Sequence, residues 1–133
     1  MLGKVDRKVI ATKNAPIASG PYSQAIVTGK LVFTAGQLPL DPQTNKITAE
    51  NFEGQLRQVM RNLDAVLLAA GTDLKNVVKF TVFLTDLKNF ATLNVVFSEY
   101  FPEAAPARSA IQVSRLPLDV LVEIEAIAAL EED

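Results

Sequence analysis

Three charged residues lie in apolar stretches near the C-terminal end of the chain, at a spacing suited to acid–base chemistry. Arg108 lies in PARSAIQV, residues 106–113, and Glu123 and Glu125 lie in DVLVEIEAIAA, residues 119–129. Carboxylates two residues apart on a strand share one face and stand about 7 Å apart. Burial raises the pKa of a carboxylate unless a cation is close, and a guanidinium binds carboxylates bidentately. The pattern therefore indicates either a structural Arg–Glu ion pair across neighbouring strands, or a clamp for a substrate carboxylate beside a general base.

The composition narrows the chemistry that the chain can perform. The 133 residues include no Cys and no His, which excludes a thiolate nucleophile, a zinc-finger-type site and the commonest general base. The net charge is −2 and the 13 basic residues are scattered, so we expect no nucleic-acid partner. No apolar run approaches the roughly 20 residues of a membrane span, and the N-terminus MLGKVDRKVI lacks a signal-peptide core. We expect a cytoplasmic protein of one domain, residues 1–133, without a metal site.

Two periodicities predict the elements that must position these groups. Apolar residues at helical spacing predict a long helix after Thr48, the expected N-cap, that ends at Gly71. A second helix is expected to bury Phe90, Leu93, Phe97 and Phe101. Strands are expected at residues 7–12, 22–28, 31–37, 76–85, 106–113 and 119–129. The order of these helices and strands along the chain predicts an α+β fold, a two-layer sandwich with both helices on one face of a mixed six-stranded sheet.

The sheet face without helices is expected to be partly apolar and therefore to be an interface. If the strands alternate as expected, this open face carries apolar residues together with a few polar and charged ones. Such a surface indicates self-association with sites at the subunit boundaries. The assignment depends on strand phase, because a one-residue slip moves every side chain to the other face. The residues expected there are Phe33, Phe83, Leu121, Ile127, Arg108, Gln112, Glu123 and Glu125.

Two further polar residues each allow two interpretations. Asn94 lies one helical turn from Phe90, where an interior Asn is unfavourable, so it either binds something specific or is partly exposed. Tyr22 opens a strand after Gly20-Pro21, where a packing role with a satisfied hydroxyl is more typical than a catalytic one.

Taken together, several motifs identify a family. GPYSQA (20–25), FTAGQLPLDPQT (33–44), VVKFTVFLTDLKNFATLN (77–94), PARSAIQV (106–113) and LPLDVLVEIEAIA (116–128) resemble the RidA branch of the Rid/YjgF reactive-intermediate deaminases, over nearly the whole chain. The resemblance implies a chorismate-mutase-like homotrimer whose sheets face inward, with sites between subunits. It implies hydrolysis of 2-imino and enamine acids, such as 2-aminoacrylate and 2-aminocrotonate, to 2-oxo acids and ammonia. It implies no cofactor and no membrane partner.

The same resemblance assigns roles to individual residues. Arg108 would hold the substrate carboxylate, Glu123 would position or activate water, and Tyr22 would reach the pocket across the subunit boundary. The other implied substrate-binding positions are Gly36 and Ala110 through main-chain groups, Phe83 as an apolar wall, Asn94 in the pocket, and Ala35 beside Gly36.

Two residues depart from the family pattern, and two other functions are alternatives to deamination. Many members carry Cys where this chain has Ala110, so that position supplies only backbone and shape, and some carry Ser where this chain has Ala35. A carboxylate-binding or chaperone-like module would need Arg108 but not Glu123. Endoribonuclease activity is the less favoured rival, because the chain is acidic and has no His.

Overall fold

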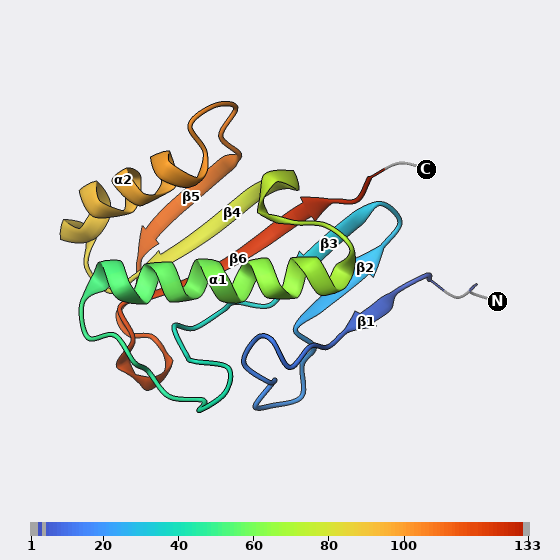
Figure 1. Cartoon of the computed structure of the whole chain (residues 1–133), viewed down its shortest axis with the longest axis horizontal. Helices are drawn as coiled ribbons and strands as arrows, with labels where there is room; N and C mark the ends of the chain where they lie inside the picture. The colour runs from blue at the N-terminus through green and yellow to red at the C-terminus, as the bar shows by residue number, and fades with distance from the viewer. Residues whose placement is uncertain (1–2, 4, 132–133) are drawn as a thin grey trace.

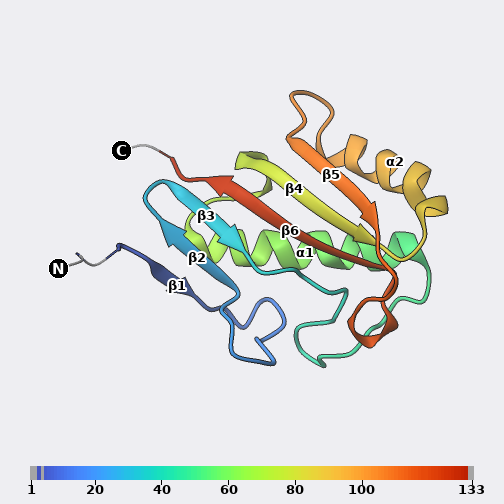
Figure 2. The ribbon, with the colours of Figure 1, turned by 180° about the vertical axis from the view of Figure 1, so that it is seen from behind.

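One six-stranded sheet and two α-helices make up the fold, and both helices lie on the same face of the sheet (Figure 1, Figure 2). The computed structural model describes residue 3 and residues 5–131. The expected α+β sandwich of two layers is confirmed. The elements are β1 (Lys8–Ile10), β2 (Ala25–Thr28), β3 (Leu31–Thr34), α1 (Phe52–Ala70), β4 (Val77–Leu84), α2 (Phe90–Tyr100), β5 (Ala107–Gln112) and β6 (Val122–Ala129), with short 3-10 turns at Leu74–Asn76, Leu87–Asn89 and Pro117–Asp119.

The strand order places the last strand in the middle of the sheet. The order is β1-β2-β3-β6-β4-β5, and every neighbouring pair is antiparallel except β4 and β5, which are parallel. Parallel neighbours need a crossover connection, and α2 supplies it between β4 and β5. Consequently β6, which carries Glu123, is central, whereas β5, which carries Arg108, lies at an edge.

The core lies between the helices and the covered face of the sheet. Leu56 and Leu63 of α1 are fully buried, as are Phe80 of β4 and Ile124 of β6. The ring of Phe80 packs edge-on against Phe97 of α2, with 5.3 Å between their centroids, which fixes α2 over β4. Within the described residues, no helix is both long and apolar enough to cross a membrane.

The first turn of α1 differs from the expected one. Asn51, not Thr48, caps the helix, and its side-chain oxygen accepts a hydrogen bond from the Gly54 N–H at 2.8 Å. Asn is as good an N-cap as Thr and lies directly before the first buried helical residue, Phe52, so the helix begins three residues later. The C-terminal end is as expected: Gly71 adopts the left-handed conformation at φ 94°.

The predicted orientation of β5 was wrong. Arg108 and Ala110 pair with Phe80 and Val82, two fully buried residues beneath the helices. Paired residues on neighbouring strands share a face, so Arg108, Ala110 and Gln112 lie on the helix-covered face. Both faces of this edge strand are of similar apolarity, so the sequence pattern alone did not decide the phase.

The open face otherwise carries the expected residues. Glu123 pairs with Phe83, and both are half-buried on this face together with Glu125 and Ile127. Phe33 is 40% exposed and contributes apolar surface. Leu121 was expected there as well, but it precedes β6 and packs against the core, where its N–H donates to Gln55 Oε1.

Candidate active site

The side chain of Arg108 lies against α2, where three residues of one helical face hold it. Its Nη2 donates to Asn94 Oδ1 at 2.7 Å, and its guanidinium carbon lies 5.4 Å from the Phe90 ring centre and 5.1 Å from that of Phe97. Residues 90, 94 and 97 follow each other at helical spacing, so α2 presents all three to the same side. A cavity of about 370 Å³ opens beside them, lined by Asn94, Phe97, Ser98, Phe101, Ala105, Pro106 and Arg108.

Arg108 keeps an uncompensated positive charge. Within the described part of the chain, no carboxylate forms an ion pair with it. Partial burial lowers its pKa, yet a guanidinium remains charged at any physiological pH. Arg57 shows the opposite situation, since Glu99 and Glu53 bind it at 2.8 and 3.1 Å and raise its pKa. The Arg108 cavity is therefore suited to a small anionic ligand.

Glu123 lies on the other face of the sheet, directly beside the backbone of Gly36. The Gln37 N–H donates to the Ile124 carbonyl at 2.8 Å and brings Gly36 against β6. A Cβ at position 36 would collide with Glu123 Oε2 and stand 2.9 Å from its Cδ, so only glycine leaves this carboxylate its place. Burial raises the pKa of Glu123, and the nearby Glu125 adds to the effect. A raised pKa makes the carboxylate a better general base near neutral pH.

Arg108 and Glu123 cannot act together within one chain. Arg108 pairs with Phe80 on the covered face, whereas Glu123 pairs with Phe83 on the open face. The expectation that both lie on the open face is therefore wrong, and so is a structural ion pair between them in one chain. A site that uses both must combine residues from two chains.

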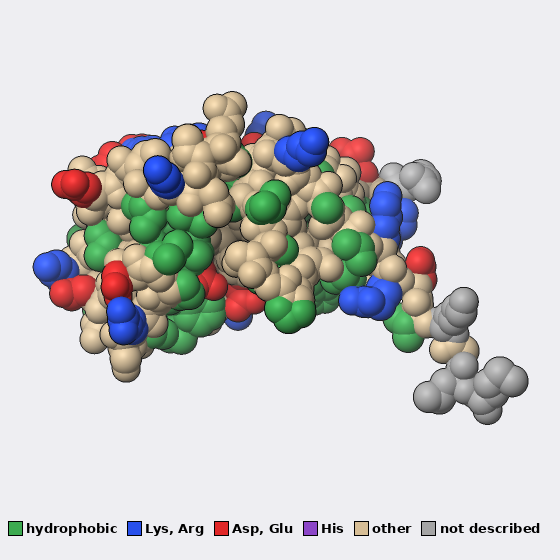
Figure 3. Space-filling view, turned by 90° about the horizontal axis from the view of Figure 1, so that it is seen from below, with side chains coloured by type: hydrophobic (Ala, Val, Ile, Leu, Met, Phe, Trp, Pro, Cys, Tyr) green, Lys and Arg blue, Asp and Glu red, His purple; other side chains and the backbone are tan. Residues whose placement is uncertain are grey.

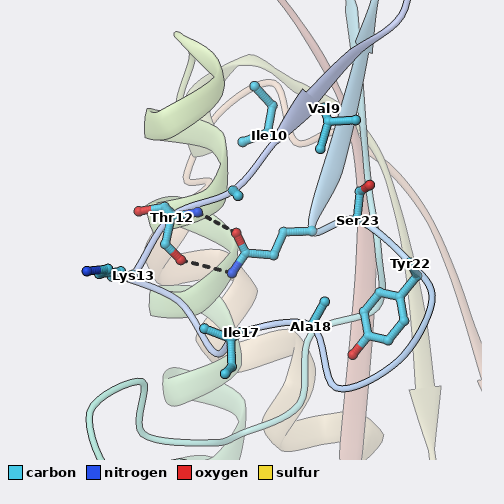
Figure 4. Close-up of a pocket in the computed structure, with 10 residues that line it drawn as sticks. Val9, Ile10, Thr12, Lys13, Ile17, Ala18, Tyr22 and Ser23 are labelled. Atoms are coloured by element: carbon cyan, nitrogen blue, oxygen red, sulfur yellow. Dashed lines mark hydrogen bonds between the residues drawn. The ribbon is translucent and has the colours of Figure 1, made fainter.

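Tyr22 lies between two cavities at the end of the sheet where the loops gather. One cavity, of about 360 Å³, is shared by Tyr22, Gly36 and Leu118, and the other, also of about 360 Å³, runs past Ile17 (Figure 4). The Tyr22 side chain is 53% exposed, and its hydroxyl accepts a hydrogen bond from the Ser19 N–H at 3.2 Å. The hydroxyl is thus held by its own loop, while the ring borders the space next to Gly36.

The remaining predicted site residues lie either on the Glu123 side of the sheet or on strand β5, which carries Arg108. Ala35 donates its N–H to the Gln24 carbonyl at 2.8 Å and so fixes the loop that carries Gly36. Phe83 lies next to Glu123 on the open face. Ala110 lies beside Val82 with its side chain packed towards the core.

The sequence did not single out three residues that contact Arg108 or line these cavities. Phe90 and Phe97 were expected only as core, although their helical spacing from Asn94 was a usable signal. Leu118 lines the Gly36 cavity, is 64% exposed and adopts a left-handed conformation at φ 58°, which no sequence motif indicated. Seen from the loop end (Figure 3), the surface mixes groups of apolar side chains with acidic and basic ones.

Comparison with known proteins agrees with this architecture. The family model described as "Endoribonuclease L-PSP" matches residues 12–130. The 2-iminobutanoate/2-iminopropanoate deaminase of Salmonella typhimurium is 48% identical over 124 residues, 91% of this chain and 96% of that protein. A Yersinia pestis protein of unknown function from the conserved Rid family superposes with a TM-score of 0.90 at 46% identity, covering 94% of this chain and 100% of that one.

A third relative was solved with a ligand. Escherichia coli TdcF with bound serine superposes with a TM-score of 0.88 at 46% identity, covering 93% of this chain and 99% of that one. The chain therefore belongs to the Rid/YjgF family, to which the Endoribonuclease L-PSP model corresponds.

Proposed function

We propose that the protein hydrolyses small 2-imino acids and their enamine forms to 2-oxo acids and ammonia. The observation that carries the proposal is Arg108, a cation with no paired carboxylate among the described residues, at a cavity sized for a small molecule. The deaminase name of the Salmonella relative supports the reaction, and the serine in TdcF supports a ligand with a carboxylate beside a nitrogen-bearing carbon. The iminobutanoate and iminopropanoate derived from aminocrotonate and aminoacrylate are the substrates we propose.

The working site is proposed to form between subunits of a homotrimer. The support is the separation of Arg108 and Glu123 onto opposite faces, which a second chain would overcome by placing its open face near the first chain's β5 edge. Exposed apolar residues on the open face, Phe33 and Ile111, favour such an association. In this arrangement, Arg108 and Asn94 come from one subunit, and Glu123 and Gly36 come from its neighbour.

The proposed chemistry is addition of water followed by loss of ammonia. Arg108 binds the substrate carboxylate and orients the C=N carbon, which lowers the entropic barrier. The substrate reacts as the iminium, protonated on nitrogen. Glu123 accepts a proton from water while the water oxygen bonds to the iminium carbon, and the electrons of the C=N π bond move to the nitrogen, which becomes NH2. Glu123 then returns the proton to the nitrogen and takes the proton of the new hydroxyl as the C–N bond breaks, ammonia leaves and the C=O bond forms; that last proton passes to the released ammonia. Tyr22, Phe83 and the backbone at Ala35 and Gly36 would line the Glu123 side of the site.

Replacing Gly36 by alanine is expected to reduce turnover while the protein stays folded. The added methyl group must displace the Glu123 carboxylate, and a displacement of about 1 Å in a catalytic group costs roughly 100-fold in rate. The experiment measures kcat, which reports turnover, and the thermal midpoint of unfolding, which reports whether the protein stays folded. Gly3→Ala is the matched control, since nothing lies within 4 Å of its added Cβ. Full activity in Gly36→Ala would show that the Glu123 position does not matter.

The reaction itself is tested by coupling the protein to a threonine dehydratase. The dehydratase releases 2-aminocrotonate, and we expect the protein to accelerate the formation of 2-oxobutanoate in proportion to its concentration. Glu123→Gln separates the enzyme from a binding module: we expect it to lose turnover yet still bind 2-oxobutanoate. A wild-type protein that binds this acid without accelerating its formation would be a carboxylate-binding module instead.

A further inference from the structure

We infer that Asn94, Phe90 and Phe97 form a charge-neutral mount for Arg108, and that the neutrality of residue 94 lets the site accept an anion. The inference rests on the proposed function, because it takes Arg108 as the group that binds the substrate carboxylate. It assigns Asn94 a positioning role through Arg108, in place of the direct substrate contact that the resemblance implied.

The contacts with Asn94, Phe90 and Phe97 hold the guanidinium in one position and do not neutralise its positive charge. Asn94 Oδ1 lies 2.7 Å from Nη2 and accepts one of the five N–H groups of the side chain, so four remain for a ligand. The Phe90 and Phe97 rings, at 5.4 and 5.1 Å, attract the cation through their electron-rich faces and carry no net charge. All three contacts hold Arg108 and none neutralises it.

Other arginines of the chain show what a charged mount does. Arg115 binds Asp119 through both ends of the carboxylate, with Nε–Oδ1 at 2.6 Å and Nη2–Oδ2 at 3.1 Å. Arg57 likewise lies between Glu53 and Glu99. In both cases the bidentate or paired contact occupies the donors that a ligand carboxylate would need. At Arg108, an amide stands where these two arginines have a carboxylate.

The difference between an amide and a carboxylate gives an almost isosteric test. Asn94→Asp keeps the acceptor oxygen that faces Nη2 and adds one negative charge. The side chain of Arg108 should stay in place, and so should the fold. The new carboxylate would compete with the ligand and repel it. Asn94→Ala removes the acceptor and leaves the cation free, so that only the positioning is lost.

The experiment measures binding of 2-oxobutanoate by calorimetry to the whole 133-residue chain and to three variants. We expect Asn94→Asp to weaken binding by more than about tenfold, and Asn94→Ala to weaken it by only about threefold. Asn14→Asp is the control for added charge: Asn14 is exposed and follows β1, at the opposite edge of the sheet from β5. Its affinity should equal that of the wild type.

The pattern among the variants decides the inference. Equal losses in Asn94→Asp and Asn94→Ala would show that Asn94 serves as a ligand contact or a purely structural residue, and would overturn it. Wild-type affinity in Asn94→Asp would overturn it as well. Turnover is measured separately: an inactive wild-type protein that still shows the expected order of affinities would refute the deaminase and retain the mount.

Discussion

Arg108→Ala is expected to reduce turnover of 2-iminobutanoate by more than about 1000-fold, because the substrate loses both its anchor and its orientation. The Arg108→Ala variant should still fold like the wild type. Arg108 has no ion pair among the described residues, it lies at the sheet edge, and its one side-chain hydrogen bond goes to an exposed Asn94. The far-UV circular dichroism and the oligomeric mass should therefore match those of the wild type.

Two companion variants make this result specific. Arg108→Lys keeps the charge and loses the planar pair of donors, so we expect an activity between those of the wild type and Arg108→Ala. Arg61→Ala removes an exposed arginine of α1 whose Nη2 donates to Gln58 Oε1, and it should leave kcat and KM unchanged. If Arg108→Ala turned over the imine with an unchanged KM, the carboxylate would be bound elsewhere.

Mixing two inactive variants is expected to restore activity. Arg108→Ala retains Glu123, and Glu123→Gln retains Arg108. In a ring of three in which each site takes Arg108 from one subunit and Glu123 from the next, every mixed trimer contains one complete site. Random assembly from equal amounts should therefore regain about a quarter of the wild-type activity, and neither variant should show activity alone.

The measurement is turnover after the two variants have been unfolded together and refolded, or produced together in one cell. Refolding each variant by itself is the control for the procedure. Activity that merely equals the sum of the separate variants would mean that the two residues do not meet across a subunit boundary. In that event Arg108 and Glu123, which lie on opposite faces of the sheet, would belong to different sites.

The sequence predicted the helices and strands better than it predicted which face of the sheet each side chain occupies. The spacing of apolar residues located both helices, and the alternation in β4 and β6 placed Phe83, Glu123 and Glu125 on the open face. These strands have two clearly different faces, so their phase could be determined from the pattern. In β5, the covered face carries Arg108 and Ala110 while the open face carries the 47%-exposed Ile111, the reverse of the usual rule.

The error in β5 has a physical cause. The position of a partly buried arginine looks polar in a sequence, and only the three-dimensional structure shows that α2 supplies two aromatic rings and an amide to hold it. The close contact between Gly36 and Glu123 was also hidden, because it joins residues far apart in the chain through a single bridge between Gln37 and Ile124. Family resemblance named both residues without explaining why they must be neighbours.

The parallel pairing of β4 with β5 keeps the proposed carboxylate-binding residues within one continuous stretch of the sequence. Strand β4, helix α2 and strand β5 form one uninterrupted β-α-β segment, residues 77–112, and it contains Arg108, Asn94 and both flanking phenylalanines. The residues proposed to activate water, Gly36 and Glu123, come from distant parts of the chain. We therefore expect that exchange of residues 77–112 between homologues would transfer the proposed carboxylate-binding residues as one contiguous segment, together with Phe83, which pairs with Glu123.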